Sequence, residues 1–504
     1  MEKKRSENSH ENLVGRQPGK ARRGKIDKEI EFGTDGWRGI IADDFTFANV
    51  RICAQAVSDY IKESGFRDQG VVMGYDTRFA SEDFATAAAE VFAGNGIRVL
   101  MCTGPTPTPA VSFCTLSRQA AGGIMITASH NPAQWNGFKI KNRYGSSASP
   151  EVTNRIEAEI DRLAATGSIN RTPLEEARRQ GLLETIDTEE IYFKQISKLV
   201  NLEEIRKSPF KIAVDPMYGT GAGYFKQLLS GGNIEIVEIN SERNPIFPGI
   251  KQPEPIADNL IKLSETVIKE GAVVGLATDG DADRLGVIDE NGDFISTSHT
   301  FALLCLYLLE IRNKRGPIIK TLTISRMLDL LGDMFDVPVH ETAVGFKYIA
   351  PKMQSEHALV GGEESGGYGF RDHVIERDGI VAGLFLLDFM VKTGKSPSEL
   401  IGYLQSKVGA HSYRRIDVHF PEGSRQSIIE KVQKYSPKTL GGINVASKDT
   451  MDGFRFTLDD SSWLLIRFSS TEPLLRLYAE SSSRERVDKL LKTARELVSK
   501  EIEP

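Results

Sequence analysis

The chain has 504 residues, of which 40% are hydrophobic, 26% charged and 8% aromatic. These fractions are typical of a globular protein and exclude disordered, collagen-like and membrane-spanning classes. Because a single core stops growing near roughly 250–300 residues, we expect about three or four domains. The 63 Lys and Arg against 69 Asp and Glu leave a net charge of −6, so neither nucleic acid nor a membrane is an expected partner.

The cysteines and the first residues predict a cytoplasmic setting. Cys53, Cys102, Cys114 and Cys305 show no CxxC spacing, and we interpret them as buried apolar thiols in a reducing compartment. Residues 1–29 are polar and contain no apolar run, so we expect a disordered tail and no secretory signal.

From residue 30 onward, short β-branched runs alternate with polar loops and helix-period stretches. Strands that alternate with helices form a mostly parallel sheet with helices on both faces, so the order predicts an α/β fold. Such sheets bind ligands beyond the carboxyl ends of their strands, where each polar motif of this chain falls. The runs are residues 70–75, 122–126, 211–214, 273–277 and 358–360.

The last hundred residues predict a different class of domain. Residues 463–468 and 474–479 read as two strands joined by a short turn, and an apolar stripe over 487–498 predicts a final helix. This pattern indicates an antiparallel α+β domain. The region 151–185 reads as polar and helical, and 103–109 (TGPTPTP) as a rigid connection. We expect a tail over 1–29 and domains over 30–186, 187–296, 297–407 and 408–504.

Asp279, Asp281 and Asp283 form the most informative cluster. Three carboxylates at alternate positions after an apolar strand repel one another unless a cation is present, and hard oxygen ligands of this kind suit Mg²⁺. An EF-hand is disfavoured, because Arg284 stands where that loop needs glycine. The motif alone also permits a solvated turn with an aspartate at a helix N-cap.

A serine loop precedes this cluster in the chain. Ser129 lies in the motif TASHNP (127–132), which is followed by NGFK (136–139). A serine in a loop after an apolar strand is a candidate nucleophile or phosphate carrier. No GxSxG elbow surrounds Ser129, which disfavours a hydrolase, and an N-cap serine in a polar loop remains the alternative.

Two later loops carry the chemistry expected for a phosphorylated sugar. Residues 361–367 (GGEESGG) combine permissive backbone with Glu363 and Ser365, which suit vicinal hydroxyls. Residues 467–472 (RFSSTE) offer a guanidinium, hydroxyls and turn amides, which suit a phosphate. Each loop alone is equally compatible with an ordinary turn.

Together, and in this order, the motifs resemble the α-D-phosphohexomutase family of phosphoglucomutases and phosphomannomutases. The resemblance implies three related mixed-sheet α/β domains and a C-terminal α+β domain around a central cleft. The matching motifs are FGTDGWRG (32–39), GYDTR (74–78), TASHNP, NGFK, TDGDADR (278–284), GFK (345–347), GEESGG (362–367), ERDG (376–379) and STEP (470–473).

The resemblance also implies roles for individual residues. Ser129 would be the phosphoserine and would hold Mg²⁺ together with Asp279, Asp281 and Asp283. The further catalytic candidates are Arg38, His130, Lys139 as a general base, and His373 as an acid or base. The substrate-binding candidates are Arg284, Gly345, Lys347, Glu363, Ser365, Arg467, Ser469, Ser470 and Thr471. Ser470 departs from the family pattern, which has glycine there, and Gly367 stands where many phosphomannomutases carry histidine.

The implied activity is the interconversion of hexose 1-phosphate and hexose 6-phosphate. Ser129 would pass its phosphoryl group to the sugar, and glucose 1,6-bisphosphate would serve as activator and intermediate. The GEES pattern resembles phosphoglucomutases, so we expect glucose first and mannose second. The alternatives are a Mg²⁺-dependent sugar phosphatase and a catalytically silent mutase-like binding protein. The expected partner is a small phosphosugar, and the chain is expected as a monomer or dimer.

Overall fold

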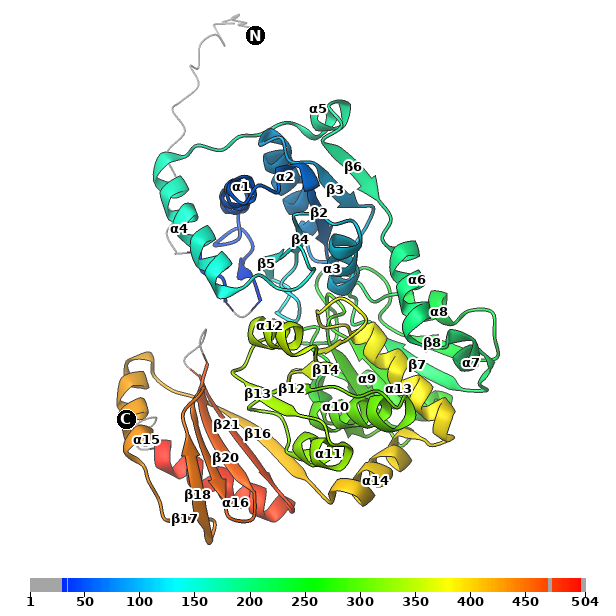
Figure 1. Cartoon of the computed structure of the whole chain (residues 1–504), viewed down its shortest axis with the longest axis vertical. Helices are drawn as coiled ribbons and strands as arrows, with labels where there is room; N and C mark the ends of the chain where they lie inside the picture. The colour runs from blue at the N-terminus through cyan, green and yellow to red at the C-terminus, as the bar shows by residue number, and fades with distance from the viewer. Residues whose placement is uncertain (1–29, 34, 470–473, 500–504) are drawn as a thin grey trace, which may run out of the picture.

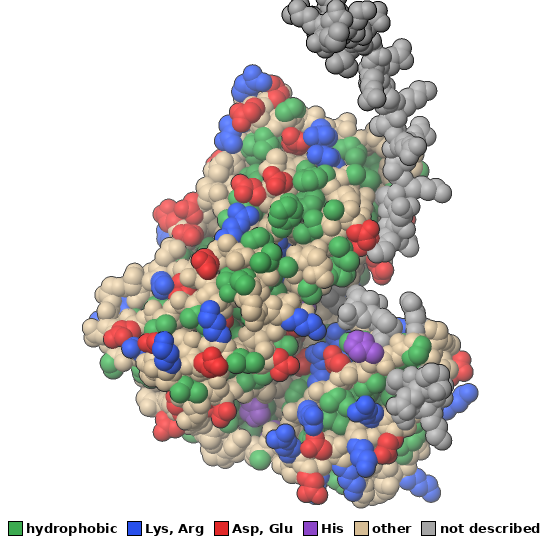
Figure 2. Space-filling model, turned by 180° about the vertical axis from the view of Figure 1, so that it is seen from behind, with side chains coloured by type: hydrophobic (Ala, Val, Ile, Leu, Met, Phe, Trp, Pro, Cys, Tyr) green, Lys and Arg blue, Asp and Glu red, His purple; other side chains and the backbone are tan. Residues whose placement is uncertain are grey.

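The computed structural model describes residues 30–33, 35–469 and 474–499, and its four sheets follow one another along the chain. Figure 1 shows the first domain at the top, the second and third packed below it, and the fourth beside the third. On the face seen in Figure 2, acidic and basic side chains are interspersed. None of the described helices is long and apolar enough to cross a membrane.

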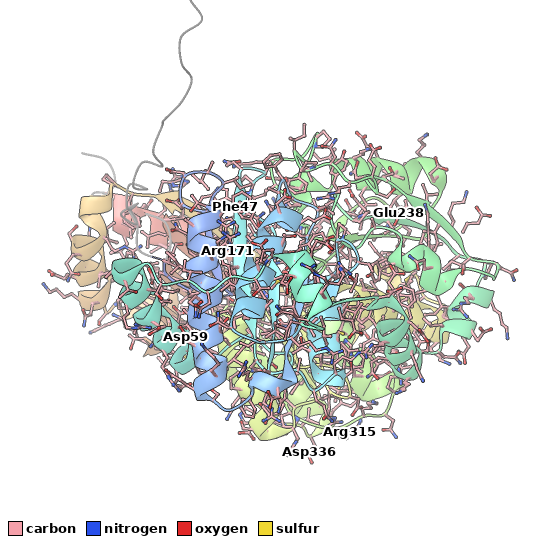
Figure 3. The ribbon with its side chains drawn as sticks, turned by 90° about the horizontal axis from the view of Figure 1, so that it is seen from above. Phe47, Asp59, Arg171, Glu238, Arg315 and Asp336 are labelled. Atoms are coloured by element: carbon pink, nitrogen blue, oxygen red, sulfur yellow. The ribbon has the colours of Figure 1, made fainter. Side chains whose placement is uncertain are left out.

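The first domain is built on a six-stranded mixed sheet of order β1-β5-β4-β2-β3-β6, in which β5 runs antiparallel to β1 and β4. Val71 and Met73 pack under α1, α2 and α4, whereas Val72 packs under α3. In Figure 3, Phe47 marks the start of α1 and Asp59 lies about one turn before its end. The elements are β1 (Trp37–Ile40), α1 (Phe47–Glu63), β2 (Val71–Tyr75), α2 (Ser81–Gly94), β3 (Val99–Cys102), α3 (Thr108–Ser117), β4 (Gly122–Ile126), β5 (Trp135–Lys141), α4 (Pro150–Thr166), α5 (Leu174–Arg179) and β6 (Leu183–Ile186).

One expectation for this domain was wrong. The region 151–185, expected to be helical throughout, ends in β6, which pairs in parallel with β3. Only Leu183 and Ile186 of this strand are buried, because β6 is the edge strand of the sheet. So short an apolar signal does not distinguish a strand from a helix end.

The second domain has a five-stranded sheet of order β11-β10-β9-β7-β8, in which β7, β8 and β9 are parallel and β10 is antiparallel to β9. Leu263 and Val267 of helix α9 cover one face of this sheet. The elements are α6 (Glu189–Leu199), α7 (Leu202–Lys207), β7 (Lys211–Asp215), α8 (Tyr224–Leu229), β8 (Glu235–Glu238), α9 (Ile261–Glu270), β9 (Val274–Thr278), β10 (Leu285–Ile288) and β11 (Phe294–Ile295).

The third domain shares its core with the second. Its sheet has the order β13-β12-β14-β15, with only β15 antiparallel. Helix α13 is buried on nearly every side, and a Cβ on its Gly383 would lie 2.8 Å from the ring of Phe225 in the second domain. The elements are α10 (Thr297–Leu306), a π-helical turn (Tyr307–Ile311), β12 (Ile318–Thr321), α11 (Met327–Phe335), β13 (Val339–Thr342), α12 (Phe346–Glu356), β14 (Val360–Gly362), β15 (Tyr368–Phe370), α13 (Gly379–Thr393) and α14 (Pro397–Val408).

The fourth domain is an antiparallel sheet of order β16-β21-β20-β19-β18-β17 with its own core. Helices α15 and α16 cover one face, and Trp463, Leu465 and Tyr478 on the other face pack against Leu322 of the third domain. The elements are β16 (Ser412–His419), α15 (Arg425–Lys434), β17 (Thr439–Leu440), β18 (Ile443–Asp449), β19 (Phe454–Leu458), β20 (Trp463–Phe468), β21 (Leu474–Ser481) and α16 (Arg484–Ser499).

The candidate loops of the first three domains occupy equivalent places in their sheets. In the first three domains, a parallel strand is followed by an antiparallel neighbour, and the serine, aspartate and sugar-type loops connect β4 to β5, β9 to β10 and β14 to β15. The fourth loop connects β20 to β21. The expected fold class, three mixed-sheet α/β domains and a C-terminal α+β domain, is therefore confirmed. Because each contains one complete sheet, we propose 30–186, 187–296, 297–407 and 408–504 as the domains.

Candidate active site

Ser129 follows β4 with a backbone that is unusual for serine. Its φ is +52°, in the left-handed region, and its amide donates to Thr127 Oγ1 at 2.8 Å. The guanidinium of Arg78 is fully buried and donates to the carbonyls of Ser129 at 2.7 Å and Asn131 at 2.6 Å. These bonds hold the loop in one conformation.

A second set of contacts fixes Arg78 itself. Its Nε lies 3.1 Å from Asp76 Oδ2, which also accepts a hydrogen bond from Thr127 Oγ1 at 2.5 Å. Both Asp76 and Arg78 come from the GYDTR motif, which the sequence analysis matched without assigning a role. They form the support of the serine loop.

The serine reaches the aspartate cluster of the second domain. Ser129 Oγ donates to Asp279 Oδ2 at 2.7 Å, although the two residues are 150 positions apart. Asp279 Oδ1 accepts from the amides of Asp283 and Arg284 at 2.9 and 3.1 Å. One carboxylate oxygen from each of Asp279, Asp281 and Asp283 lies within 4.8 Å of the others, and all three residues are buried.

The oxygens of this cluster fit a hard cation. Asp281 Oδ1 and Asp283 Oδ1 are buried and have no hydrogen-bond partner among the described residues. Lys139 Nζ donates to their Oδ2 atoms, at 2.7 Å to Asp281 and 3.1 Å to Asp283. A buried carboxylate oxygen without a partner is costly unless an ion satisfies it, and an all-oxygen set suits Mg²⁺.

The charges of the cluster are strongly coupled. Burial and repulsion from Asp283 and Asp281 hold the pKa of Asp279 well above its usual value. Burial would raise the pKa of Asp281 too, but Lys139 outweighs it, and that pKa is lowered. Burial opposes the charge of Lys139, yet Asp281, Asp283 and Asp35 raise its pKa. Lys139 is therefore a hydrogen-bond donor in this arrangement.

His130 lies beside Ser129 in surroundings that lower its pKa. Its Nδ1 lies 3.3 Å from Ser129 Oγ. Burial lowers the pKa of His130 well below its usual value, and Arg284 and Arg38 lower it further. Cations that keep a neighbouring imidazole neutral also favour a dianionic phosphoryl group on this serine.

Arg38 and Arg284 each donate to a polar partner beside the serine loop. Arg38 donates to Asn131 Oδ1 at 2.6 Å, and Arg284 donates to Glu254 Oε1 at 2.9 Å. Because a guanidinium carries five N–H donors, both side chains have donors left over for a ligand.

Arg377 joins the aspartate cluster to the sugar-type loop. Its Nη2 lies 2.7 Å from Asp283 Oδ2, and its Nη1 lies 3.5 Å from Glu363 Oε2. It also pairs with Asp35 of the first domain. Burial raises the pKa of Glu363, although Arg377 opposes this effect.

A buried ion network extends from Arg377 into the first domain. Lys141 Nζ lies 2.7 Å from Glu376 Oε2, and Ser147 Oγ donates to Asp35 Oδ1 at 3.0 Å. Sequence reasoning matched the motifs that contain Asp35 and Glu376 but gave these residues no function, and it did not single out Lys141. The FGTDG and ERDG motifs were the sequence signal that could have identified Asp35 and Glu376 as functional residues.

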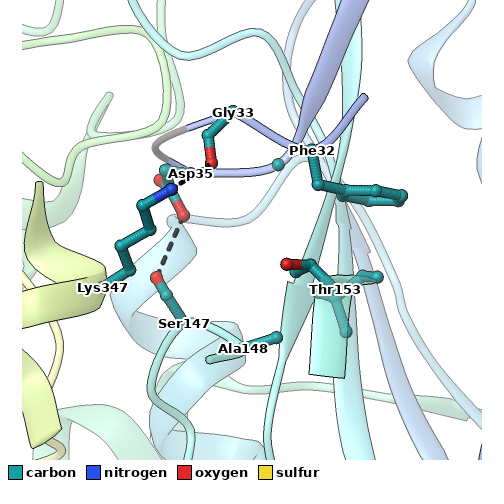
Figure 4. A pocket seen from close by; sticks show the side chains of 9 residues that line it. Phe32, Gly33, Asp35, Ser147, Ala148, Thr153 and Lys347 are labelled. Carbon is teal, nitrogen blue, oxygen red and sulfur yellow. Dashed lines mark hydrogen bonds between the residues drawn. The ribbon is translucent and has the colours of Figure 1, made fainter. Parts of the chain in front are cut away.

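The remaining substrate-binding candidates of the third domain are Lys347, Gly345 and Ser365. Lys347 Nζ donates to Gly33 O at 3.2 Å, beside a cavity of about 10 Å³ that Asp35 and Ser147 also line (Figure 4). Gly345, whose φ is +129°, precedes helix α12 and so positions Lys347. Ser365 Oγ is buried and has no hydrogen-bond partner within the described ranges.

The phosphate-type loop is described in part. Arg467 Nε lies 3.0 Å from Asp452 Oδ2, and Ser469 O accepts a hydrogen bond from Arg425 at 2.6 Å. Ser470 and Thr471 lie outside the described residues.

His373 lies in a different environment. Its Nε2 lies 2.9 Å from Asp378 Oδ2, the same oxygen to which Tyr192 Oη donates at 2.7 Å. Its ring stacks on Phe113 at 5.4 Å. In the described part of the chain, no hydrogen bond or ring contact joins His373 to Ser129 or to the aspartate cluster of the second domain.

Comparison with known families agrees with this arrangement. Models of phosphoglucomutase/phosphomannomutase match over 29–166 (alpha/beta/alpha domain I), 190–292 (domain II), 296–407 (domain III) and 420–497 (C-terminal domain). The four matched domains define a mutase of the phosphotransferase type. The chain belongs to the phosphoglucomutase/phosphomannomutase family.

Individual relatives carry different substrate names. A Thermococcus kodakarensis protein named phosphoglucomutase/phosphomannomutase is 33% identical over 91% of this chain and 96% of its own length. A Pyrococcus abyssi protein assigned as a phosphoglucosamine mutase is 31% identical over 93% of this chain and 97% of its own. A solved Thermus thermophilus structure assigned as a phosphomannomutase is 35% identical, with a TM-score of 0.81 over 94% of this chain and 99% of its own.

Proposed function

We propose that the protein interconverts hexose 1-phosphate and hexose 6-phosphate, with glucose as the preferred hexose and mannose second. The observation that carries the proposal is the 2.7 Å hydrogen bond from Ser129 Oγ to Asp279 Oδ2, which joins the serine to a buried carboxylate cluster. We assign Asp279, Asp281, Asp283 and a phosphoserine oxygen of Ser129 as the ligands of Mg²⁺. The cation would neutralise charge on the phosphoryl group during transfer.

The proposed reaction conserves phosphate. The Oγ–P bond of phosphorylated Ser129 breaks and a P–O bond to the 6-hydroxyl oxygen of hexose 1-phosphate forms. The hydroxyl proton passes to a base, and the leaving Ser129 Oγ takes up a proton. The resulting hexose 1,6-bisphosphate turns around in the cleft. The O1–P bond then breaks as the 1-phosphoryl group returns to Ser129 Oγ, which gives up its proton to the base. O1 takes up a proton, and hexose 6-phosphate is released.

The residues around Ser129 support this transfer through charge and position. Arg38 and Arg284 bring two guanidiniums toward the developing charge, which is the main requirement of phosphoryl transfer. His130 is neutral and lies 3.3 Å from Ser129 Oγ, so it is our first candidate for proton exchange. Lys139, the second candidate, donates to three carboxylates in this arrangement.

The remaining candidates would bind the sugar and its distal phosphate. Ser365 Oγ has no partner in the described part of the chain, which leaves it free to bond to a hexose hydroxyl, and Glu363 lies in the same loop. Lys347, placed by Gly345, would line the sugar site. Arg467 and Ser469, with Ser470 and Thr471, would hold the phosphate that is not reacting.

The test is a phosphorus NMR time course on glucose 1-phosphate, with Mg²⁺ and a trace of glucose 1,6-bisphosphate. We expect glucose 6-phosphate to grow at constant total ester. Mannose 1-phosphate and glucosamine 1-phosphate at the same concentration then rank the hexoses, and a faster rate with either overturns the preference for glucose. Growth of inorganic phosphate would indicate a phosphatase, and unchanged spectra with all three sugars would indicate a silent binding protein.

A further inference from the structure

Thr108 makes two hydrogen bonds to Asp281, one of the proposed metal ligands. Its Oγ1 donates to Asp281 Oδ2 at 2.6 Å, and its backbone amide donates to Asp281 O at 2.9 Å. Neither residue is accessible to solvent. The sequence analysis interpreted the segment that contains Thr108, 103–109, only as a rigid connection.

These contacts make the two oxygens of Asp281 unequal. Oδ2 accepts from Thr108 Oγ1 and from Lys139 Nζ, which uses both of its lone pairs. Oδ1 is buried and accepts nothing from the described residues. The carboxylate is therefore held in one rotation, with Oδ1 as the oxygen left for a cation.

The bonds also cross a domain boundary. Thr108 is the first residue of α3 in the first domain, whereas Asp281 lies in the β9–β10 loop of the second. Pro107 and Pro109 flank Thr108, and their fixed φ angles restrict the backbone on both sides. Thr108 is therefore presented to Asp281 from a stiff support.

We propose that Thr108 is a positioning residue of the cation site, which holds Asp281 so that Oδ1 faces the ion. Mg²⁺ affinity then depends on how the first domain sits on the second. This inference rests on the proposed metal site. Outer partners of metal ligands typically contribute about 10–100-fold to metal affinity.

The experiment is a calorimetric titration of the full chain with Mg²⁺ alone, in one phosphorylation state of Ser129 verified by intact mass. Thr108→Val removes the hydroxyl but keeps the amide and the branched shape, and we expect about 10–100-fold weaker binding. Thr108→Ser keeps the hydroxyl and should bind within about threefold of the wild type. Should the valine variant not fold, Thr108→Ala removes the same hydroxyl without added bulk.

The matched control is Thr106→Val in the same segment. Thr106 Oγ1 donates to Gly104 O at 2.8 Å rather than to Asp281, so its loss should leave Mg²⁺ affinity unchanged. Wild-type affinity in Thr108→Val or Thr108→Ala, or a loss in Thr108→Ser or Thr106→Val as large as that in Thr108→Val, would overturn the role of Thr108 while the metal site stands. A wild-type chain that binds Mg²⁺ no better than Asp281→Asn would overturn the metal site itself.

Discussion

At Ser129 the backbone carries part of the specialisation of the site. A left-handed conformation costs a serine roughly 1–2 kcal/mol, because its Cβ approaches the following carbonyl. The bonds from Arg78 to the carbonyls of Ser129 and Asn131 hold this conformation, and with it the hydrogen bond to Asp279. The strained backbone of Ser129 therefore lowers the stability of the loop but holds the serine hydroxyl beside the aspartate cluster.

Replacing Ser129 tests its role as the phosphoryl carrier. Ser129→Ala should abolish mutase turnover and leave the circular dichroism spectrum and thermal midpoint close to those of the wild type. Ser112→Ala is a matched control, because Ser112 is also buried in the first domain and its Oγ has no partner among the described residues. That control should keep full activity. A wild-type rate in Ser129→Ala would remove the serine from the mechanism.

At the scale of elements, the loops of the first two domains meet backbone to backbone. A Cβ on Gly280 of the second domain would lie 2.5 Å from Ser129 O of the first. Within the second domain, a Cβ on Gly219 would lie 2.7 Å from Gly280 O. Glycine is required at these places because any side chain would push the loops apart. Without a side chain at these positions, the loops of the two sheets can approach closely enough to share a reaction centre.

Gly280→Ala should therefore separate the serine loop from the aspartate loop. We expect turnover to fall by at least about 100-fold, since small misplacements of reacting groups have effects of that size. Gly402→Ala serves as the control. Gly402 lies inside α14, and an added methyl group would have no described atom within 4 Å beyond its chain neighbours and the nearby backbone of its own helix, so alanine there should stabilise by about 0.5–1 kcal/mol. Steady-state kinetics and thermal midpoints of both variants test this prediction, and equal turnover in the two would contradict it.

At the scale of the whole molecule, buried charged side chains make contacts between the domains. Arg377 of the third domain pairs with Asp283 of the second and Asp35 of the first. Glu480 of the fourth domain accepts from Ser325 Oγ of the third domain at 2.6 Å, and also from Trp463 Nε1 of its own domain at 2.7 Å. Domain packing and site assembly therefore depend on the same residues.

Arg377→Met should destabilise the chain by about 3–5 kcal/mol, because it leaves buried carboxylates without their counter-cation. It should also raise the KM for the sugar phosphate, since Arg377 contacts Glu363. Arg98→Met, which removes an exposed pair with Glu184, should cost no more than about 1 kcal/mol. Denaturant unfolding of both variants measures the difference, and equal losses would contradict the prediction.

His411 makes the stability of the fourth domain dependent on pH. Its Nδ1 lies 2.6 Å from Glu480 Oε1. Burial lowers the pKa of His411, but the hydrogen bond to Glu480 outweighs it, and the pKa is raised. A raised folded-state pKa contributes stability that is complete below the ordinary histidine pKa of about 6.5 and is lost as pH rises through the raised value.

The wild type should therefore exceed His411→Gln in thermal midpoint at pH 6 and lose that advantage by pH 9. The exposed His419 provides the control, and His419→Gln should follow the wild type at both values. A gap between wild type and His411→Gln that stays constant with pH would show that the charge on His411 does not contribute to stability.

Much of the architecture was predictable from local pattern. Apolar strand runs followed by polar loops predicted the α/β sheets, and the α+β class of the last hundred residues is confirmed. A short apolar run that forms a strand buried on both faces, as in Val71, Val72 and Met73, is a local property, so sequence reveals it. The short edge strand β6 was missed, because two buried residues are too weak a signal.

The motifs likewise located Ser129 and the three aspartates without any structure, because each motif is a short string with its own chemistry. Which side chains meet across domains depends on sheet register and domain packing, and only the tertiary structure decided it. Thr108 and Asp281 are 173 positions apart, and Asp35 and Arg377 are 342 apart. No periodicity links such pairs. The same long-range contacts make Lys139, expected as a general base, a donor to three buried carboxylates, because its protonation follows from the neighbours that folding brings to it.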